Sequence, residues 1–140
     1  MGTITADEFR TRLGEPCVMS GLSGVPPKHR GRHILLKSVT LTLDPAERYS
    51  ESDINDRLIF WLTDIAPSVR LDHVSLRRWL VDEAYLGRDP SGRSYRVYPT
   101  GPEMFEREVE DVEVYETIGL TRKRLQEKKR EHLNPRAVAP

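Results

Sequence analysis

The chain has 140 residues, of which 37% are hydrophobic and 31% charged, and its 22 basic and 22 acidic side chains balance to a net charge of zero. This length favours a single domain, and the low apolar content requires one part of the chain to hold most of the core. No run of about 18 apolar residues occurs, which excludes a membrane-spanning helix. The zero net charge gives no global attraction to nucleic acid.

The N-terminal segment, residues 1–26, is expected to form a short helix followed by a linker. Thr5 and Glu8 have the spacing of a capping box, which predicts a helix over about residues 6–13. Gly14 is predicted to end this helix. The rest of the segment is rich in Gly and Pro, a composition typical of a loop.

The N-terminal segment also indicates in which cellular compartment the protein is expected. The charged N-terminus does not have the pattern of a signal peptide. Cys17 is the single cysteine and has no internal partner for a disulfide. We therefore expect a cytoplasmic protein.

Three helices are predicted in the middle of the chain. Apolar residues recur at helical spacing over about residues 28–43, 51–65 and 72–84. Ser50 and Asp72 stand where the second and third of these helices begin, and both residue types are favoured N-caps. The second helix has a strong amphipathic pattern, with Ile54, Leu58, Trp61, Leu62 and Ile65 on one face.

Short strands are predicted around these helices. Tyr49 lies where a strand of one or two residues fits, and residues 85–88 and 94–98 flank a turn with Pro and Gly, which predicts a β-hairpin. Helix, minimal strand, helix, helix and hairpin is the order of a winged helix-turn-helix. We therefore predict a mainly α fold with a small β-hairpin, in which residues 27–98 form a winged-helix-like domain.

The remaining residues, 99–140, are predicted to be a charged helical extension with a disordered end after about residue 133. Residues 103–118 fit either a helix with a thin apolar stripe or a partly extended segment. The extension is acidic first (Glu103, Glu106, Glu108, Glu110, Asp111, Glu113, Glu116) and basic later (Arg122, Lys123, Arg124, Lys128, Lys129, Arg130). Charge blocks of opposite sign indicate that residues 99–133 either pair in a homodimer or bind a protein partner. The alternative is that they form a solvated appendage.

Motifs in the middle of the chain resemble those of a small bacterial family. They stand in order at suitable spacing: Tyr49-Ser50-Glu51-Ser52-Asp53-Ile54-Asn55, Leu76-Arg77-Arg78-Trp79-Leu80-Val81-Asp82, Leu86-Gly87-Arg88 and Tyr95-Arg96. They are similar to the pattern Tyr-x-Glu-x-x-Val-Asn, Leu-Arg-Arg-x-Leu-Val-Asp, Leu-x-Arg and Tyr-x-Arg of a domain-of-unknown-function family found attached to ArsR-type winged-helix regulators. This sequence departs from the pattern at Ile54, where the pattern has Val, and in extra residues around 65–71. The resemblance covers about residues 27–98 and implies a link to transcription.

Double-stranded DNA is the first partner that this fold suggests. The helix over residues 72–84 is the candidate recognition helix, because in this fold the second helix of the turn enters the major groove. The candidate DNA contacts on that helix and on the hairpin are His73, Ser75, Arg77, Arg78, Arg88, Arg93 and Arg96. The alternative is that these arginines form structural ion pairs, since Arg78 and Asp82 lie four residues apart on the outward face.

A second basic cluster begins the first middle helix. Lys28, Arg30 and Arg32 could contact a nucleic-acid backbone or an acidic partner, or could be a solvated helix start. His29 and His33 share one helical face, but no carboxylate or thiolate pattern near them completes a metal site. We therefore expect neither a metal nor a cofactor.

No motif of an enzyme occurs in the sequence. A Walker loop, a nucleotide-type glycine fingerprint and a Gly-x-Ser-x-Gly elbow are all missing. Two hypotheses follow. The first is a small winged-helix regulator that binds DNA. The second is a non-enzymatic interaction or scaffolding module that has the winged-helix shape without binding DNA, an alternative suggested by the zero net charge and by Asp82.

Overall fold

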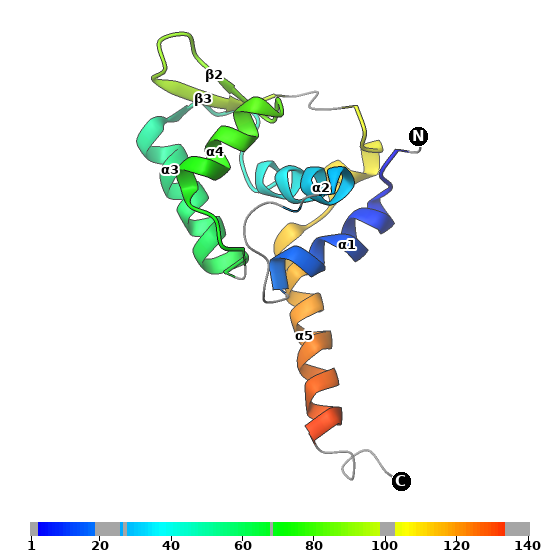
Figure 1. Cartoon of the computed structure of the whole chain (residues 1–140). Helices are drawn as coiled ribbons and strands as arrows, with labels where there is room; N and C mark the ends of the chain where they lie inside the picture. The colour runs from blue at the N-terminus through cyan, green and yellow to red at the C-terminus, as the bar shows by residue number, and fades with distance from the viewer. Residues whose placement is uncertain (1–2, 19–25, 27, 68, 99–102, 134–140) are drawn as a thin grey trace.

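The computed structural model of the protein describes residues 3–18, 26, 28–67, 69–98 and 103–133. Their elements, in chain order, are α1 (Ala6–Val18), α2 (His29–Thr40), β1 (Tyr49–Ser50), α3 (Glu51–Phe60), the π-helical turn η1 (Trp61–Ile65), α4 (His73–Asp82), β2 (Leu86–Arg88), β3 (Ser94–Val97), the 3-10 helix η2 (Arg107–Asp111) and α5 (Val114–Leu133). Helices therefore dominate, with one small sheet, as the sequence predicts (Figure 1). No helix among the described residues is long and apolar enough to cross a membrane.

The predicted helices of the middle segment are confirmed, together with their caps. Ser50 accepts a hydrogen bond from the backbone N–H of Asp53 at 3.0 Å, and Asp72 accepts one from the N–H of Ser75 at 3.3 Å. These bonds satisfy N–H groups that the first helical turn leaves free. The second predicted helix is α3 continued by η1, because the chain widens into a π turn at Trp61 rather than ending.

The sheet is antiparallel, with the strand order β1-β3-β2. Tyr49 pairs with Tyr95, and Tyr95 pairs with Arg88 on its other side, so β3 is the central strand. The predicted strand at Tyr49 and the predicted hairpin are both confirmed. The two tyrosines are buried and turn one face of the sheet toward the helices.

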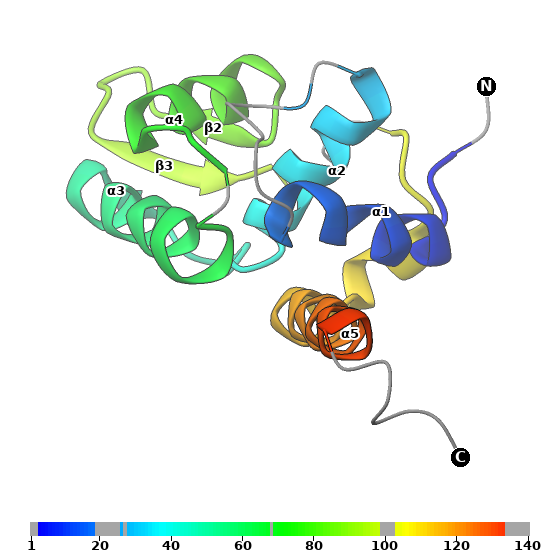
Figure 2. The same cartoon turned by 60° about the horizontal axis from the view of Figure 1, so that its bottom comes forward.

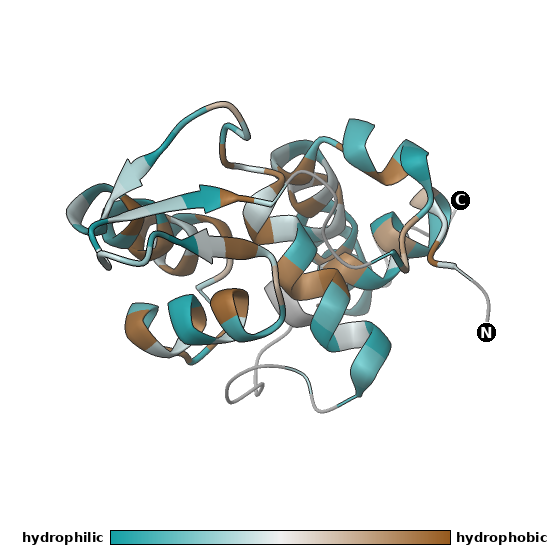
Figure 3. Ribbon diagram, turned by 90° about the horizontal axis from the view of Figure 1, so that it is seen from above, coloured by the Kyte–Doolittle hydropathy of each residue, from teal (hydrophilic) through white to brown (hydrophobic). Residues whose placement is uncertain are grey.

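One hydrophobic core joins the middle segment to both flanks. Ile4, Phe9 and Leu13 are buried in it from the N-terminal side, and Val109 and Ile118 from the C-terminal side. In Figure 2, α1 lies between α2 and α5, and Figure 3 marks hydrophobic residues along the helices that contribute to this core. The flanks have few apolar residues, and those that they have are buried against the middle helices.

The prediction that Gly14 ends the first helix is wrong, because α1 continues through Gly14 to Val18. Gly14 is buried and faces Thr121 of α5; a Cβ at this position would lie 2.4 Å from Thr121 Cγ2. The glycine therefore permits a close approach of two helices. The predicted cap at the other end is confirmed, since Thr5 Oγ1 accepts the N–H of Glu8 at 3.0 Å.

Residues 103–118 are partly extended and partly helical, so they combine the two structures between which the sequence does not decide. Phe105 pairs with Ile4 in an isolated parallel bridge, η2 follows, and α5 begins at Val114. Val114, Thr117 and Ile118 are the buried residues of α5. The second half of this helix extends away from the body (Figure 1), so only its first turns are anchored. The division of the chain at residues 26 and 98 stays a prediction.

Candidate nucleic-acid interface

The candidate interface is a groove between α4 and the hairpin. Its volume is about 330 Å³, and it is lined by Val74, Arg77, Arg78, Val81, Asp82, Arg88 and Tyr95. The chain turns sharply between these elements because Ala84 has a left-handed conformation, with φ of 64°. That turn, closed by a hydrogen bond from Tyr85 N–H to the carbonyl of Leu80 at 2.8 Å, sets β2 beside the helix. Three of the predicted contacts, Arg77, Arg78 and Arg88, therefore meet at one groove.

Arg77 is held inside a structural network. Its guanidinium donates to Asn55 Oδ1 at 2.5 Å, lies 3.5 Å from Glu51 Oε1, and sits 5.6 Å from the centre of the Tyr95 ring. The side chain is only 18% exposed. Arg77 thus ties α4 to α3 and to β3, and Glu51 offsets its charge.

Arg88 lies on the other side of the groove. Its guanidinium is 5.8 Å from the centre of the Tyr95 ring, so this tyrosine has cation–π contacts with Arg88 and Arg77. Gly92 in the turn has φ of 74°, and a Cβ there would be 2.9 Å from Arg88 Nη2. The positive φ thus favours glycine at this turn, and the guanidinium of Arg88 lies beside it.

Arg78 is the exposed arginine of α4 in this groove. It also lines a shallow adjoining pocket with Ser75, Trp79 and Asp82. Asp82 lies one turn further along, but within the described part of the chain no ion pair joins Arg78 to it or to another acid. The predicted structural pair of Arg78 and Asp82 is therefore not formed, and both side chains face solvent.

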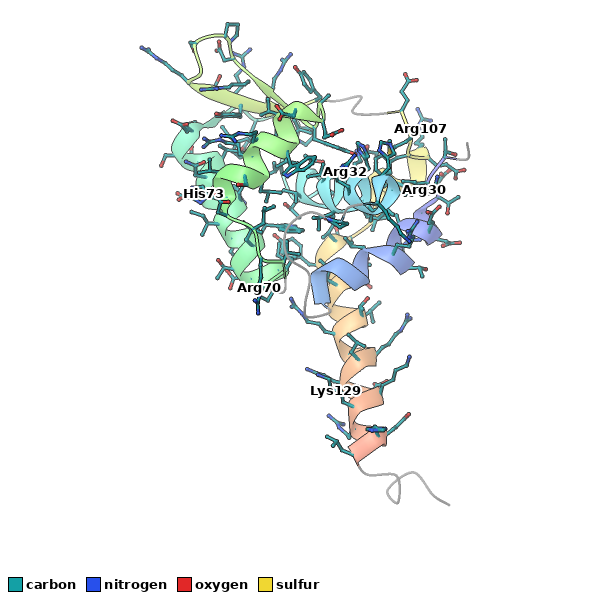
Figure 4. All side chains as sticks on the ribbon, viewed as in Figure 1. Arg30, Arg32, Arg70, His73, Arg107 and Lys129 are labelled. Carbon is teal, nitrogen blue, oxygen red and sulfur yellow. The ribbon has the colours of Figure 1, made fainter. Side chains whose placement is uncertain are left out.

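The two remaining predicted contacts on α4 lie near its start. Ser75 faces the shallow pocket beside Arg78, while its N–H is used by the Asp72 cap. The pKa of the Asp72 carboxyl is lowered below its usual value, chiefly by hydrogen bonds with Ser75. The capping carboxylate is therefore kept ionised. Figure 4 shows His73 at the outer edge of the body, on the side of α3.

Arg93 and Arg96 occupy different parts of the hairpin. Arg93 is exposed in the turn, where its N–H donates to Ser91 Oγ at 3.3 Å. Arg96 is exposed on β3 and lines a second groove together with Arg48. Sequence reasoning missed Arg48, although its place next to Tyr49 could have indicated that it borders the sheet.

Two side chains of the basic cluster at the start of α2 contact different helices. Arg30 binds Glu8 of α1 through two hydrogen bonds, of 2.9 and 2.6 Å, and this pairing lowers the pKa of Glu8. Arg32 stacks on Trp79 of α4, 5.2 Å from the ring centre, and Lys28 is exposed just before the helix. Figure 4 shows Arg30 and Arg32 at this end of α2. Of the cluster, Arg32 thus borders α4, while Arg30 holds α1 in place.

His33 is buried beside the turn that follows α4. Its Nδ1 lies 2.7 Å from the hydroxyl of Tyr85, and its Nε2 lies 3.4 Å from Glu83 Oε2. Burial, more than the nearby charge of His29, lowers the pKa of His33, so the neutral ring is favoured in the fold. Within the described residues, no three His, Cys, Asp or Glu side chains are grouped so as to hold a metal ion.

Comparison with known protein families gives a match over the middle of the chain. A family model described as an uncharacterized protein conserved in bacteria (DUF2087) matches residues 21–97, which is more than half of the chain. The matched part includes α2, the sheet and α4, and hence the whole groove. No curated protein and no solved structure matches the chain.

Proposed function

The chain belongs to the DUF2087 family of bacterial proteins, and on that premise we propose that residues 27–98 form a winged-helix domain that binds double-stranded DNA. In this proposal α4 is the recognition helix and the β2–β3 hairpin is the wing. The order α2, β1, α3, α4, β2, β3 supports the assignment, as does the resemblance of the motifs to domains found beside ArsR-type regulators.

The observation that carries the proposal is the groove between α4 and the hairpin. Arg77, Arg78 and Arg88 line it against one acid, Asp82. Glu51 offsets Arg77, which leaves Arg78 and Arg88 as the cations available for phosphates. Phosphate contacts of this kind supply most of the affinity of non-specific DNA binding.

Asp82 fits this function if it contacts a base rather than the backbone. An exposed carboxylate on a recognition helix repels phosphates, but it can accept a hydrogen bond from the amino group of cytosine in the major groove. Arg78, one turn before Asp82, can donate to a guanine edge or to a phosphate. Arg93 in the turn and Arg32 beside Trp79 would extend the contact along the backbone on either side.

A titration followed by fluorescence anisotropy tests DNA binding. Labelled duplexes of mixed sequence are titrated with the full chain at 50 and 200 mM salt. We expect binding at micromolar protein, with an affinity that falls steeply as salt rises, because about 0.9 counterion is released for each phosphate contacted. If the chain bound duplex DNA at neither salt concentration, this function would be excluded.

The second candidate is a protein-interaction module that acts through α5, with a second copy of the chain as the partner. The outer half of α5 is exposed and projects from the body, and Lys129 in Figure 4 lies on this part. Tyr115 and Leu133 are 51% and 79% exposed and lie 18 residues, or five helical turns, apart on one face. In an antiparallel pair each tyrosine would meet the partner's leucine, and Glu116 in the first turn of each helix would lie near Arg130 in the last turn of the other.

Analytical ultracentrifugation tests this second candidate. We expect the chain to sediment as a dimer at tens of micromolar and Leu133→Asp to sediment as a monomer, since the change places a charge in the proposed seam. Leu120→Asp is the matched control, because Leu120 is also exposed on α5 but faces another side. A monomeric wild type, or equal effects of both changes, would count against the α5 pair.

A further inference from the structure

The second groove lies on the face of the sheet that is turned away from the core. Its volume is about 280 Å³, and it is lined by Arg48, Gly87, Arg88, Asp89, Pro90, Ser94, Tyr95, Arg96 and Tyr98. Arg48 and Arg96 line it against one acid, Asp89, while the guanidinium of Arg88, which also borders the groove, lies over Tyr95, so the groove is positive although the chain is neutral. We propose that this groove binds a nucleoside phosphate, with Arg48 and Arg96 on the phosphate and Tyr98 against the base.

The register of the sheet places the two arginines side by side. Tyr49 pairs with Tyr95, so the same register continued by one residue sets Arg48 opposite Arg96. Both tyrosines are buried and both arginines are exposed, as the alternation of side chains along a strand requires. Like charges at facing positions, about 5 Å apart, destabilise a sheet, and a bound anion removes that cost.

Asp89, the acid in the groove, offsets part of the charge of the two arginines, but its carboxylate is held by the hairpin turn and pairs with neither of them. The carboxylate of Asp89 accepts hydrogen bonds from the N–H of Ser91 at 3.0 Å and from the hydroxyl of Ser94 at 3.3 Å. These bonds, chiefly that of the Ser91 N–H, lower the pKa of Asp89, and the charge of Arg48 adds to the effect. Neither Arg48 nor Arg96 forms an ion pair with an acid in the described part of the chain. Two guanidinium groups therefore remain to bind a phosphate, for which their planar donors are well suited.

Tyr98 gives the groove an aromatic wall. Its ring covers the backbone at Gly87, where a Cβ would lie 2.9 Å from both Cε1 and Cζ of the tyrosine. Gly87 thus allows the ring to lie against β2, while the side chain remains 41% exposed. An exposed ring next to phosphate-binding arginines is the combination that holds a nucleotide, because the base can stack while the phosphate is bound.

Isothermal titration calorimetry of the full chain tests the assignment with three ligands: adenosine 5′-monophosphate, adenosine and inorganic phosphate. We expect saturable binding of the nucleotide and affinities at least about tenfold lower for the other two. Arg48→Gln and Arg96→Gln should each weaken nucleotide binding by about tenfold or more, since a hydrogen bond to a charged group is worth this much. Tyr98→Ala should weaken it by about tenfold, because it removes the ring on which the base stacks. Arg93→Gln is the matched control, because Arg93 is exposed on the same hairpin but does not line the groove.

Three results would overturn the assignment. Equal affinities for phosphate and nucleotide, or no saturable heat at millimolar nucleotide, would show that no nucleoside phosphate is recognised. A short single strand with a 5′-phosphate forms a third arm, and tighter binding of this strand through the same side chains would assign the groove to a nucleic-acid end instead of a free nucleotide. The outcome is separable from duplex binding, because Arg48, Arg96 and Tyr98 do not line the groove beside Arg78, although Arg88 and Tyr95 border both grooves.

Discussion

Replacing Arg78 with glutamate is expected to weaken the binding of duplex DNA by about thirtyfold at low salt. The change removes one contact and adds a repulsive charge, and a loss of about 2 kcal/mol corresponds to that factor. The salt dependence of the affinity should become shallower by about one phosphate contact. Anisotropy titrations at several salt concentrations measure both effects.

The control for this prediction is Arg107→Glu, which alters the net charge of the chain by the same amount. Arg107 is exposed in η2 and lies far from α4 (Figure 4). We expect this variant to bind DNA almost as the wild type does. If both variants lost affinity equally, binding would depend on total charge, and the groove beside α4 would not be the DNA site.

Replacing Gly14 with alanine is expected to destabilise the fold by about 2 kcal/mol. A Cβ at Gly14 would lie 2.4, 2.6 and 2.9 Å from Cγ2, Oγ1 and Cβ of Thr121. Rotation of the threonine side chain cannot relieve all three contacts, so α1 and α5 must move apart. These short contacts correspond to the severe end of overpacking, which costs up to about 3 kcal/mol, and the gain in helix propensity of at most about 1 kcal/mol leaves a net loss of about 2 kcal/mol.

Urea unfolding of a double-mutant cycle measures this effect. Thr121→Gly removes the clashing atoms, so the double variant should be more stable than Gly14→Ala alone, even though glycine weakens α5. Gly119→Ala is the matched control on the same helix. No atom lies within 4 Å of a Cβ there, and we expect a small gain in stability. A stable Gly14→Ala variant would contradict the close approach of the two helices.

The middle of the chain could be predicted from sequence because its signals are local. The caps Ser50 and Asp72 act on backbone groups three residues away, and the apolar spacing of each helix describes one face of that helix. The hairpin was likewise indicated by a turn between two short runs. Elements defined within a few residues of sequence were therefore predicted with nearly correct bounds.

The flanks were harder to predict because their role depends on contacts over long sequence distances. Gly14 has the sequence signal of a helix end, but the neighbour that gives it another purpose, Thr121, is more than a hundred residues away. Ile4 and Phe105 pair across a similar distance. No periodicity in the sequence encodes such a partner.

The candidate sites divide in the same way. The sequence alone indicated that arginines gather on α4 and the hairpin, since residue type and helical face can be read from it. Only the tertiary structure decided which arginines are already paired with other side chains: on α4, Arg77 is held by Asn55 and Glu51, and on α2, Arg30 is held by Glu8. Only the sheet register brought Arg48 beside Arg96. The physical reason is that a charge is offset by its neighbours in space, and folding, not sequence spacing, chooses those neighbours.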